Sequence, residues 1–259
     1  MSENTQQILT ELQDGVLHVI LNRPEKKNAL TNAMYDALRA ALERAEADPA
    51  VRVVLFSGSG GSFTAGNDLG DFLNAPPQDE HSPVFRFLLA ASRASKPLAA
   101  AVAGAAVGIG TTLLLHCELV YCAPGSRFQM PFVNLGLCPE AASSLLLPAR
   151  LGHARAAELL LLGESFGAEQ ALAWGLVNAV VDGDQLLTHA VERCQALAAQ
   201  PPAAVRLTKA LLKRAQAQAV AETIALEGRH FAERLQSPEA KEAFQAFFEK
   251  RRPDFSRFS

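Results

Sequence analysis

Leu98-Ala-Ala-Ala-Val-Ala-Gly-Ala-Ala-Val-Gly-Ile-Gly110 is the stretch of this chain that decides its fold. The apolar residues up to Ala103 predict a buried strand, and a helix is expected to begin near Thr111, after the glycines. The apolar stretch from Pro97 to Leu115 is long enough for a membrane helix, but its glycines imply a tight turn. We therefore expect a buried strand–turn–helix unit and no membrane span.

Strand and helix signals alternate on both sides of this unit. Apolar and β-branched runs predict strands over 16–21 and 51–56. Apolar residues at helical spacing predict a helix over 32–47, capped by Thr31 or Asn32. Such alternation is typical of an α/β fold.

The pattern changes towards the C-terminal end, where no strand signal is found. Alanine- and leucine-rich helices are predicted over 185–199, 203–233 and 239–250, with prolines between them. We therefore divide the chain into a core of residues 1–184, which carries the candidate site, and a helical region of residues 185–259.

The composition excludes several classes of protein. The chain has 259 residues, of which 49% are hydrophobic and 20% charged, which is typical of a globular rather than a disordered protein. Its formal net charge is −3, so there is no overall basic field to hold nucleic acid. The four cysteines and six histidines fit no metal-ligand spacing, and we expect no metal site.

Both ends of the chain and its cysteines bear on the compartment. The polar N-terminal residues lack the basic and apolar regions of a secretory signal. The last residues, Ser-Arg-Phe-Ser, differ from the peroxisomal signal Ser-Lys-Leu. We interpret the cysteines as reduced, packed thiols, and the bacterial cytoplasm is the simplest expectation.

Two turns share one design, in which small residues lie between a buried strand and the start of a helix. They are Phe63-Thr-Ala-Gly-Asn67 and Gly104-Ala-Ala-Val-Gly-Ile-Gly110. Backbone N–H groups are unpaired at a helix start, so two such turns could form an oxyanion hole, although glycine-rich turns more often serve packing. The second turn departs from G-x-G-x-x-G, and the chain has no P-loop motif, which excludes these kinds of nucleotide binding.

Four segments, in order, resemble the crotonase (enoyl-CoA hydratase/isomerase) family. They are Asn22-Arg-Pro-Glu-Lys-Lys-Asn-Ala-Leu30, Phe63-Thr-Ala-Gly-Asn-Asp-Leu69, Ala103-Gly-Ala-Ala-Val-Gly-Ile-Gly110 and Asn134-Leu-Gly-Leu-Cys-Pro-Glu140. The resemblance covers about residues 8–250. It implies a spiral of ββα units with a helical C-terminal trimerisation region, and hence a homotrimer or a dimer of trimers. It also implies an acyl-CoA thioester substrate and no cofactor beyond that coenzyme A.

The resemblance assigns roles to particular residues. The backbone N–H groups of Asn67 and Ile109 would be the oxyanion donors. The residues expected to bind substrate are Lys26, Lys27, Asn28, Ala29, Ala65, Gly66, Asp68, Leu69, Gly108 and Phe132. Without the resemblance, Lys26 and Lys27 would be interpreted as a solvated turn, and Asp68 as a carboxylate that shapes its loop.

The expected reaction depends on which carboxylates are present. Hydratases of this family use two glutamates, and the corresponding positions here are Thr112 and Phe132, which cannot act as carboxylates. Glu140 follows Pro139, a pattern typical of an ordinary helix start. However, this stretch resembles the peroxisomal type of Δ3,Δ2-enoyl-CoA isomerase, in which the single catalytic carboxylate lies at the Glu140 position.

The resemblance thus implies that Glu140 moves a proton from C2 to C4 of a 3-enoyl thioester, as in fatty acid β-oxidation. Other reactions of the family, on an aromatic or branched acyl-CoA, remain open, as does enoyl-CoA hydration. A non-catalytic acyl-CoA binder or an RNA-binding relative is a further alternative. The presence of Glu140 disfavours the binder, and the net charge of −3 disfavours RNA.

Overall fold

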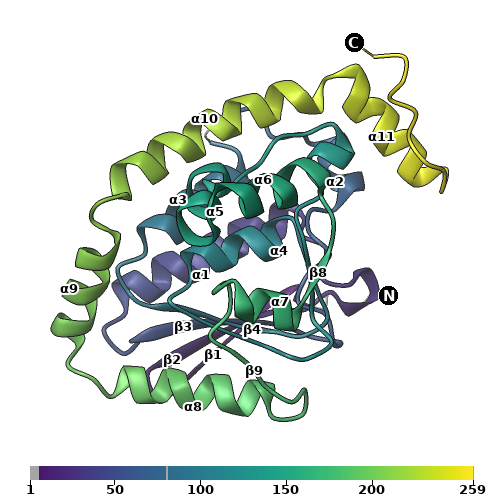
Figure 1. The fold of residues 1–259 in the computed structure, drawn as a ribbon. Helices are drawn as coiled ribbons and strands as arrows, with labels where there is room; N and C mark the ends of the chain where they lie inside the picture. The colour runs from purple at the N-terminus through teal and green to yellow at the C-terminus, as the bar shows by residue number, and fades with distance from the viewer. Residues whose placement is uncertain (1–5, 80, 259) are drawn as a thin grey trace.

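A computed structural model describes residues 6–79 and 81–258, and its centre is a six-stranded sheet (Figure 1). The strand order is β1-β2-β3-β4-β6-β9. The strands are Ile8–Gln13 (β1), Val16–Leu21 (β2), Val53–Gly58 (β3), Leu98–Val102 (β4), Leu119–Cys122 (β6) and Ala179–Val180 (β9). From β2 onwards neighbouring strands are parallel, and helices connect most of them. The predicted α/β class is confirmed.

β1 and β2 form an antiparallel hairpin that the sequence analysis missed. Asp14 and Gly15 make the turn, both with positive φ (50° and 80°). Asp-Gly favours this type of two-residue turn, because its twist matches that of the strands. The dipeptide was therefore the available signal for β1.

A second, three-stranded sheet lies beside the glycine-rich turns, in the order β5-β7-β8. Its short strands are Ala105–Val107 (β5), Arg127–Gln129 (β7) and Phe166–Gly167 (β8). An isolated bridge joins Thr64 to Ala106, and another joins Leu30 to Asn67. These bridges bring the two turns singled out in the sequence side by side.

Helices cover both faces of the large sheet (Figure 1). Those before the C-terminal region are Asn32–Ala47 (α1), Leu69–Asn74 (α2), Pro83–Arg93 (α3), Ile109–Thr112 (α4), Ser143–Leu151 (α5), His153–Leu162 (α6) and Ala168–Ala173 (α7), with 3-10 turns at Pro24–Lys26 (η1), Leu113–His116 (η2) and Val133–Leu135 (η3). The Thr31 side chain caps α1, as predicted. On the opposite face, α8 (Leu186–Ala198) packs Leu186, Ala190 and Cys194 against the sheet.

Three further helices follow, namely α9 (Pro202–Lys213), α10 (Ala217–Leu235) and α11 (Pro238–Phe248). The single helix predicted over 203–233 is therefore wrong, since residues 214–216 break it. No proline or glycine marks this break. α9 is attached beside the sheet and α10 crosses α3, so tertiary packing overrides the local helix propensity.

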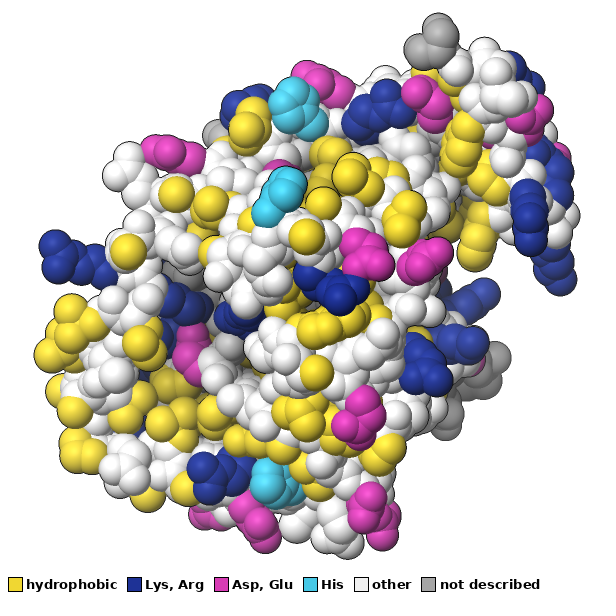
Figure 2. Space-filling model, viewed as in Figure 1, with side chains coloured by type: hydrophobic (Ala, Val, Ile, Leu, Met, Phe, Trp, Pro, Cys, Tyr) yellow, Lys and Arg dark blue, Asp and Glu magenta, His cyan; other side chains and the backbone are white. Residues whose placement is uncertain are grey.

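α9 is attached to the rest of the chain by ion pairs. The Lys209 ammonium lies 2.9 Å from the Glu118 carboxylate and donates to the Lys96 carbonyl at 2.7 Å. Lys213 lies 2.9 Å from the other oxygen of Glu118. The leucines of α9 are exposed instead, and Figure 2 shows apolar side chains along its outer side: Leu207 (61%), Leu211 (59%) and Leu212 (78%).

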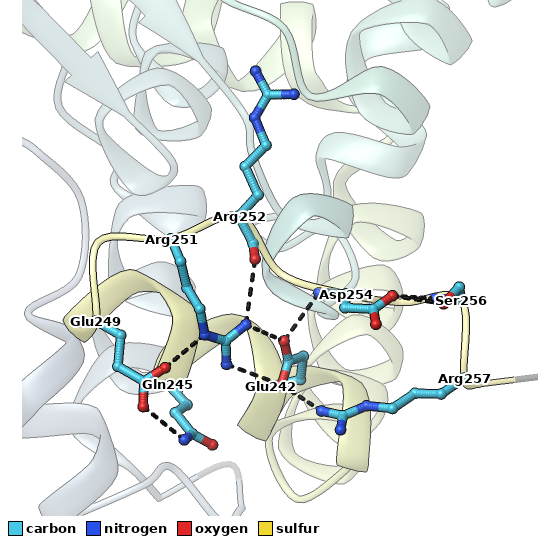
Figure 3. Close-up of polar contacts among 8 residues, drawn as sticks. All are labelled: Glu242, Gln245, Glu249, Arg251, Arg252, Asp254, Ser256 and Arg257. Atoms are coloured by element: carbon cyan, nitrogen blue, oxygen red, sulfur yellow. Dashed lines mark hydrogen bonds and ion pairs between the residues drawn. The ribbon is translucent and has the colours of Figure 1, made fainter.

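The residues after α11 fold back as an arm (Figure 3). Glu242 of α11 accepts hydrogen bonds from the side chains of Arg251 and Arg257 and from the Asp254 N–H (2.9 Å). Phe255 and Phe258 of the arm line a cavity of about 360 Å³ together with Val133, Gly136 and Leu137. The arm thereby borders the segment that leads to Glu140. No helix in residues 6–79 and 81–258 is long and apolar enough to cross a bilayer.

Candidate active site

The first turn presents an unpaired backbone donor. The Leu30 N–H donates to the Gly66 carbonyl (2.8 Å), and the Asp68 N–H donates to the Leu30 carbonyl (2.8 Å). The Asn67 N–H, which lies between them, has no acceptor within the described residues. Gly66 has φ +90°, and a Cβ there would lie 2.9 Å from the Val107 carbonyl oxygen. Only glycine fits this position without strain.

The second turn presents another such donor. The Gly108 carbonyl accepts from the N–H groups of Thr111 (2.9 Å) and Thr112 (3.0 Å), which closes the first turn of α4. The N–H of Ile109, the first residue of α4, has no acceptor within residues 6–79 and 81–258. Since the donor is a backbone group, the buried isoleucine side chain does not interfere with this role.

Strand pairing sets the spacing of the two donors. Thr64 pairs in parallel with Ala106, with hydrogen bonds of 2.9 and 3.0 Å from the Thr64 and Val107 N–H groups. Asn67 follows Thr64 by three residues, and Ile109 follows Ala106 by three residues. Beyond the bridge the two turns stay in contact, since a Cβ on Gly66 would lie 2.9 Å from the Val107 carbonyl oxygen. The two donor turns are therefore neighbours, as an oxyanion hole requires.

Glu140 is a buried carboxyl group between η3 and α5. Its exposed fraction is 1%, and its Oε1 atom has no hydrogen-bond partner among the described residues. Burial, and then the negative field of Glu227, raise the pKa of Glu140 to about 8. The expectation that Glu140 opens a helix is wrong, because α5 begins at Ser143. Ala141 and Ala142 separate the two in the left-handed conformation, with φ +60° and +57°.

Tyr35 and Phe132 are buried aromatic residues that lie against the two donor turns. The fully buried Tyr35 hydroxyl of α1 donates to the Asn67 side-chain oxygen. The pKa of Tyr35 is raised well above the usual value by burial, and then by the negative field of Glu140. Phe132 lies against the second turn, where a Cβ on Gly108 would be 4.0 Å from its ring. Sequence reasoning missed Tyr35, whose only signal was a hydroxyl within the apolar stripe of α1.

Thr112 and Phe132 line the interior without supplying a carboxylate. Both are buried, with exposed fractions of 0% and 4%. The Thr112 hydroxyl oxygen has no partner within the described part of the chain. These two side chains therefore cannot replace the glutamate pair that the resemblance assigns to hydratases.

The other predicted binding residues form the edge of the first turn. The buried Asn28 side chain accepts from the Arg23 N–H (2.8 Å) and donates to the Ser59 and Ser62 carbonyls (2.9 and 2.7 Å), so it braces two loops. Lys26 and Lys27 are exposed beside it. The half-buried members of the set are Ala29, Ala65, Asp68 and Leu69.

Asp68 shapes the first turn. It accepts a hydrogen bond from Arg23 (2.6 Å) and caps α2 through the Asp71 N–H (3.0 Å). Partial burial acts to raise the pKa of Asp68, but the Arg23 and Asp71 hydrogen bonds lower it overall. The hydrogen bonds of Asp68 to Arg23 and Asp71 are those expected of a carboxylate that shapes its loop.

A comparison with protein families settles the relationship. The family model described as enoyl-CoA hydratase/isomerase matches residues 11–257. The chain belongs to the enoyl-CoA hydratase/isomerase family. The resemblance read from the motifs is confirmed, and the chain is an enzyme of this family, whose members act on acyl-CoA thioesters.

Solved structures confirm the crotonase fold of this family member. The OdaA protein of Pseudomonas aeruginosa superimposes with a TM-score of 0.91 at 52% identity, covering 94% of this chain and 99% of OdaA. An enoyl-CoA hydratase/isomerase from Pseudoalteromonas atlantica gives 0.92 at 43% identity, covering 96% and 100%.

Curated relatives carry out more than one reaction. The 1,2-epoxyphenylacetyl-CoA isomerase of Escherichia coli is 35% identical over 256 residues, which cover 96% of this chain and 98% of that protein. Rat enoyl-CoA delta isomerase 2 is 36% identical over 219 residues, which cover 82% of this chain and 56% of the rat protein. The 2,3-dehydroadipyl-CoA hydratase of E. coli is 34% identical. Membership of the enoyl-CoA hydratase/isomerase family therefore leaves the reaction to be argued from the site.

Proposed function

We propose that this enzyme is a Δ3,Δ2-enoyl-CoA isomerase. The observation that carries the proposal is the buried carboxyl group of Glu140, with a pKa raised to about 8 and an unpartnered oxygen. Two backbone donors, on Asn67 and Ile109, accompany it. A raised pKa makes a stronger base, and free N–H groups stabilise an oxygen that gains negative charge.

The mechanism needs one base and one oxyanion hole. Glu140, in its ionised form, removes a proton from C2 of a 3-enoyl thioester, and the resulting negative charge moves to the thioester oxygen. The N–H groups of Asn67 and Ile109 donate to that oxygen. The protonated Glu140 then returns its proton to C4, which leaves a 2-enoyl thioester and the ionised carboxylate. Proton and charge balance, so no second acid or base is required.

Hydration would need more than the site offers. Adding water across the double bond requires a group that activates the water in addition to one that protonates carbon. Thr112 and Phe132 occupy the positions that the resemblance assigns to the hydratase glutamates. The phenyl ring of Phe132 would also exclude water from the intermediate.

The partners and location follow the same proposal. The loop around Lys26 and Lys27 would hold the adenine and phosphates of coenzyme A, which enters with the substrate as the only cofactor. We propose a homotrimer, or a dimer of trimers, assembled through the helical region from residue 185 onwards. The exposed leucines of α9 support this assembly. The bacterial cytoplasm remains the proposed location.

The test compares 3-hexenoyl-CoA with crotonyl-CoA as substrates of the wild type and of Glu140→Gln. We expect the wild type to convert the first to the 2-enoyl thioester and to leave the second unhydrated. Glu140→Gln should lose about 10³-fold or more in kcat. The matched control is Glu222→Gln, which removes one exposed negative charge from α10.

Two results would overturn the proposal. Fast hydration of crotonyl-CoA would show a hydratase. Inactivity on both thioesters, together with turnover of 1,2-epoxyphenylacetyl-CoA, would place the enzyme with the E. coli isomerase.

A further inference from the structure

Glu227 is a buried acidic residue that the mechanism above does not use. It lies on α10 with an exposed fraction of 6%. Its Oε2 accepts from the Ala142 N–H at 2.6 Å, and its Oε1 accepts from the Ser144 N–H at 3.0 Å and from the Ser144 hydroxyl. No Lys or Arg within residues 6–79 and 81–258 forms an ion pair with it. All its donors therefore belong to the segment that follows Glu140.

That segment has an unfavourable backbone conformation. Ala141 and Ala142 are consecutive residues with positive φ, a region that residues with a Cβ adopt rarely. Its contacts include the His116 ring nitrogen, 2.8 Å from the Ala141 carbonyl oxygen, the Ser143 N–H, which donates to the Glu140 carbonyl (3.0 Å), and Glu227, which accepts from Ala142. Without the Glu227 contacts the backbone would relax, and the direction of the Glu140 side chain would change with it.

The same contacts decide which carboxyl group is charged. Two buried carboxyl groups that repel each other titrate as a pair, and hydrogen-bond donors favour the charged form of the group they touch. Glu227 accepts three hydrogen bonds, whereas Oε1 of Glu140 accepts none from the described residues. Burial raises the pKa of Glu227, but the hydrogen bonds from Ser144 and Ala142 act against this rise. Between the two carboxyl groups, the negative charge is thus favoured on Glu227 and the proton on Glu140.

The neighbouring titratable groups do not compete for this proton near neutral pH. Burial raises the pKa of Tyr35 and raises that of Cys138 to about 11, so both stay protonated. Burial lowers the pKa of His116 to about 4, so it stays neutral. Arg234 donates to the Gly136 carbonyl (2.9 Å) and pairs with Glu239 (3.1 Å).

We propose that Glu227 is the positioning residue of the catalytic base: it fixes the backbone after Glu140 and, by carrying the negative charge of the pair, makes Glu140 the carboxyl group that exchanges the proton. This inference rests on the proposed function, since it explains how the base of that reaction is tuned.

The test is Glu227→Gln, with Glu222→Gln on the exposed side of α10 as the matched control. The glutamine has the same shape without the charge, and its amide group cannot accept from both Ala142 and Ser144. The acid limb of the kcat/KM pH profile should move down by about one pH unit, because Glu140 loses a repelling neighbour. The plateau kcat should fall about tenfold as the base weakens, with KM changed by less than about twofold.

A second readout needs no turnover. Infrared difference spectra, with Glu140→Gln identifying the protonated carboxyl band, follow the titration of Glu140 directly. Its midpoint should move down in Glu227→Gln and stay in place in Glu222→Gln. A shift without any isomerase activity would support the role of Glu227 while refuting the proposed reaction. Isomerase activity with an unmoved midpoint and unchanged kcat would overturn the role of Glu227 and leave the reaction in place.

Ser144→Ala keeps the inference testable if Glu227→Gln fails to fold. This variant retains both charges and the Ser144 N–H but removes the hydroxyl donor. Because one donor to the charged form is lost, the ionised form of Glu227 becomes less favourable. The pH midpoint of the Glu140 titration should therefore fall, by less than in Glu227→Gln. An unchanged midpoint in a folded Ser144→Ala protein would contradict the proposal.

Discussion

Two glutamates that are shielded from water differ in whether a cation lies beside the carboxylate. Glu118 lies between Lys209 and Lys213, each 2.9 Å away, and these ion pairs attach α9 to the sheet region. Among the described residues Glu140 has no such cation, and burial and then the field of Glu227 raise its pKa to about 8. The paired carboxylate stabilises the structure, whereas the unpaired one destabilises its own charged form and thereby becomes a base.

The surroundings of the two glutamates differ in the same way. Around Glu140, apolar side chains are buried and backbone donors are left free. Along α9, the buried residue is Lys209 and the leucines face outwards. The first arrangement suits a reaction in a dry interior, and the second leaves an apolar surface exposed.

The largest expected effect is on stability as a function of pH. The folded pKa of Glu140, about 8, is above the ordinary value of 4.5, so the native state holds a proton that the unfolded state has lost. Its contribution to stability is therefore complete below about pH 4.5 and is lost as pH rises to about 8, by on the order of 5 kcal/mol.

Urea unfolding of the wild type and Glu140→Gln from about pH 5 to about pH 9 measures this effect. Glu140→Gln lacks the titrating group. Its unfolding free energy, relative to that of the wild type, should therefore increase as pH rises. If the unfolding free energies of the two proteins changed with pH in parallel, Glu140 would have no raised pKa in the folded state, and the contrast with the paired Glu118 would be wrong.

The next effect concerns the donor turn. Gly66→Ala places a Cβ 2.9 Å from the Val107 carbonyl and strains a residue with φ +90°. The Asn67 N–H should move, and kcat should fall on the order of 10²-fold, as for the loss of one oxyanion donor. Gly61→Ala is the control, because it has φ +72° but nothing within 4 Å of the added Cβ. Equal losses in both variants would attribute the effect to backbone strain alone.

A smaller effect is expected where the charge is paired. Lys209→Met leaves Glu118 with Lys213 alone and should lower the unfolding free energy by about 2 kcal/mol, with kcat unchanged. Lys213→Met is the comparison, and its loss should be smaller because Lys213 is 32% exposed against 4% for Lys209. Denaturant melts and steady-state kinetics measure both quantities. A drop in kcat matching the drop in stability would show that α9 and the site are not independent.

The smallest effect on stability is expected on the outer side of α9. Leu211→Ser changes a residue that is 59% exposed, so the unfolding free energy of a single chain should change by less than about 0.5 kcal/mol. If α9 contacts another subunit, light scattering should show a lower mass than for the wild type. Leu161→Ser on α6, at 70% exposure, is the control that should keep the wild-type mass. Identical masses for all three proteins would remove α9 from the proposed interface.

Local patterns predicted the parts of the fold that local interactions determine. β2 and α1, with its Thr31 cap, follow from alternation, helical spacing and capping. β7 and β8 have three residues and two residues, too few to show a period, and they exist because distant partners pair with them. The break at residues 214–216 likewise comes from what the two helices touch.

In the candidate site, too, some residues could be assigned from local sequence and others only from contacts between distant segments. Motif resemblance assigned roles to Asn67, Ile109 and Glu140, because these lie in short segments with a characteristic order of residues. Glu227 lies 85 residues from Ala142, which donates to it, and nothing in the pattern of α10 distinguishes it from the solvated glutamates of that helix. Only the folded chain brings the two together.

The bridge between Thr64 and Ala106 affects how this enzyme could acquire a new substrate. Because strand pairing holds both donor turns, their separation cannot change unless the pairing itself is lost. Phe132 lies outside both sheets, so its ring takes no part in the pairing that holds the two turns. Laboratory evolution towards another acyl group should therefore accumulate substitutions at wall positions such as Phe132, while the residues of the two turns stay as they are.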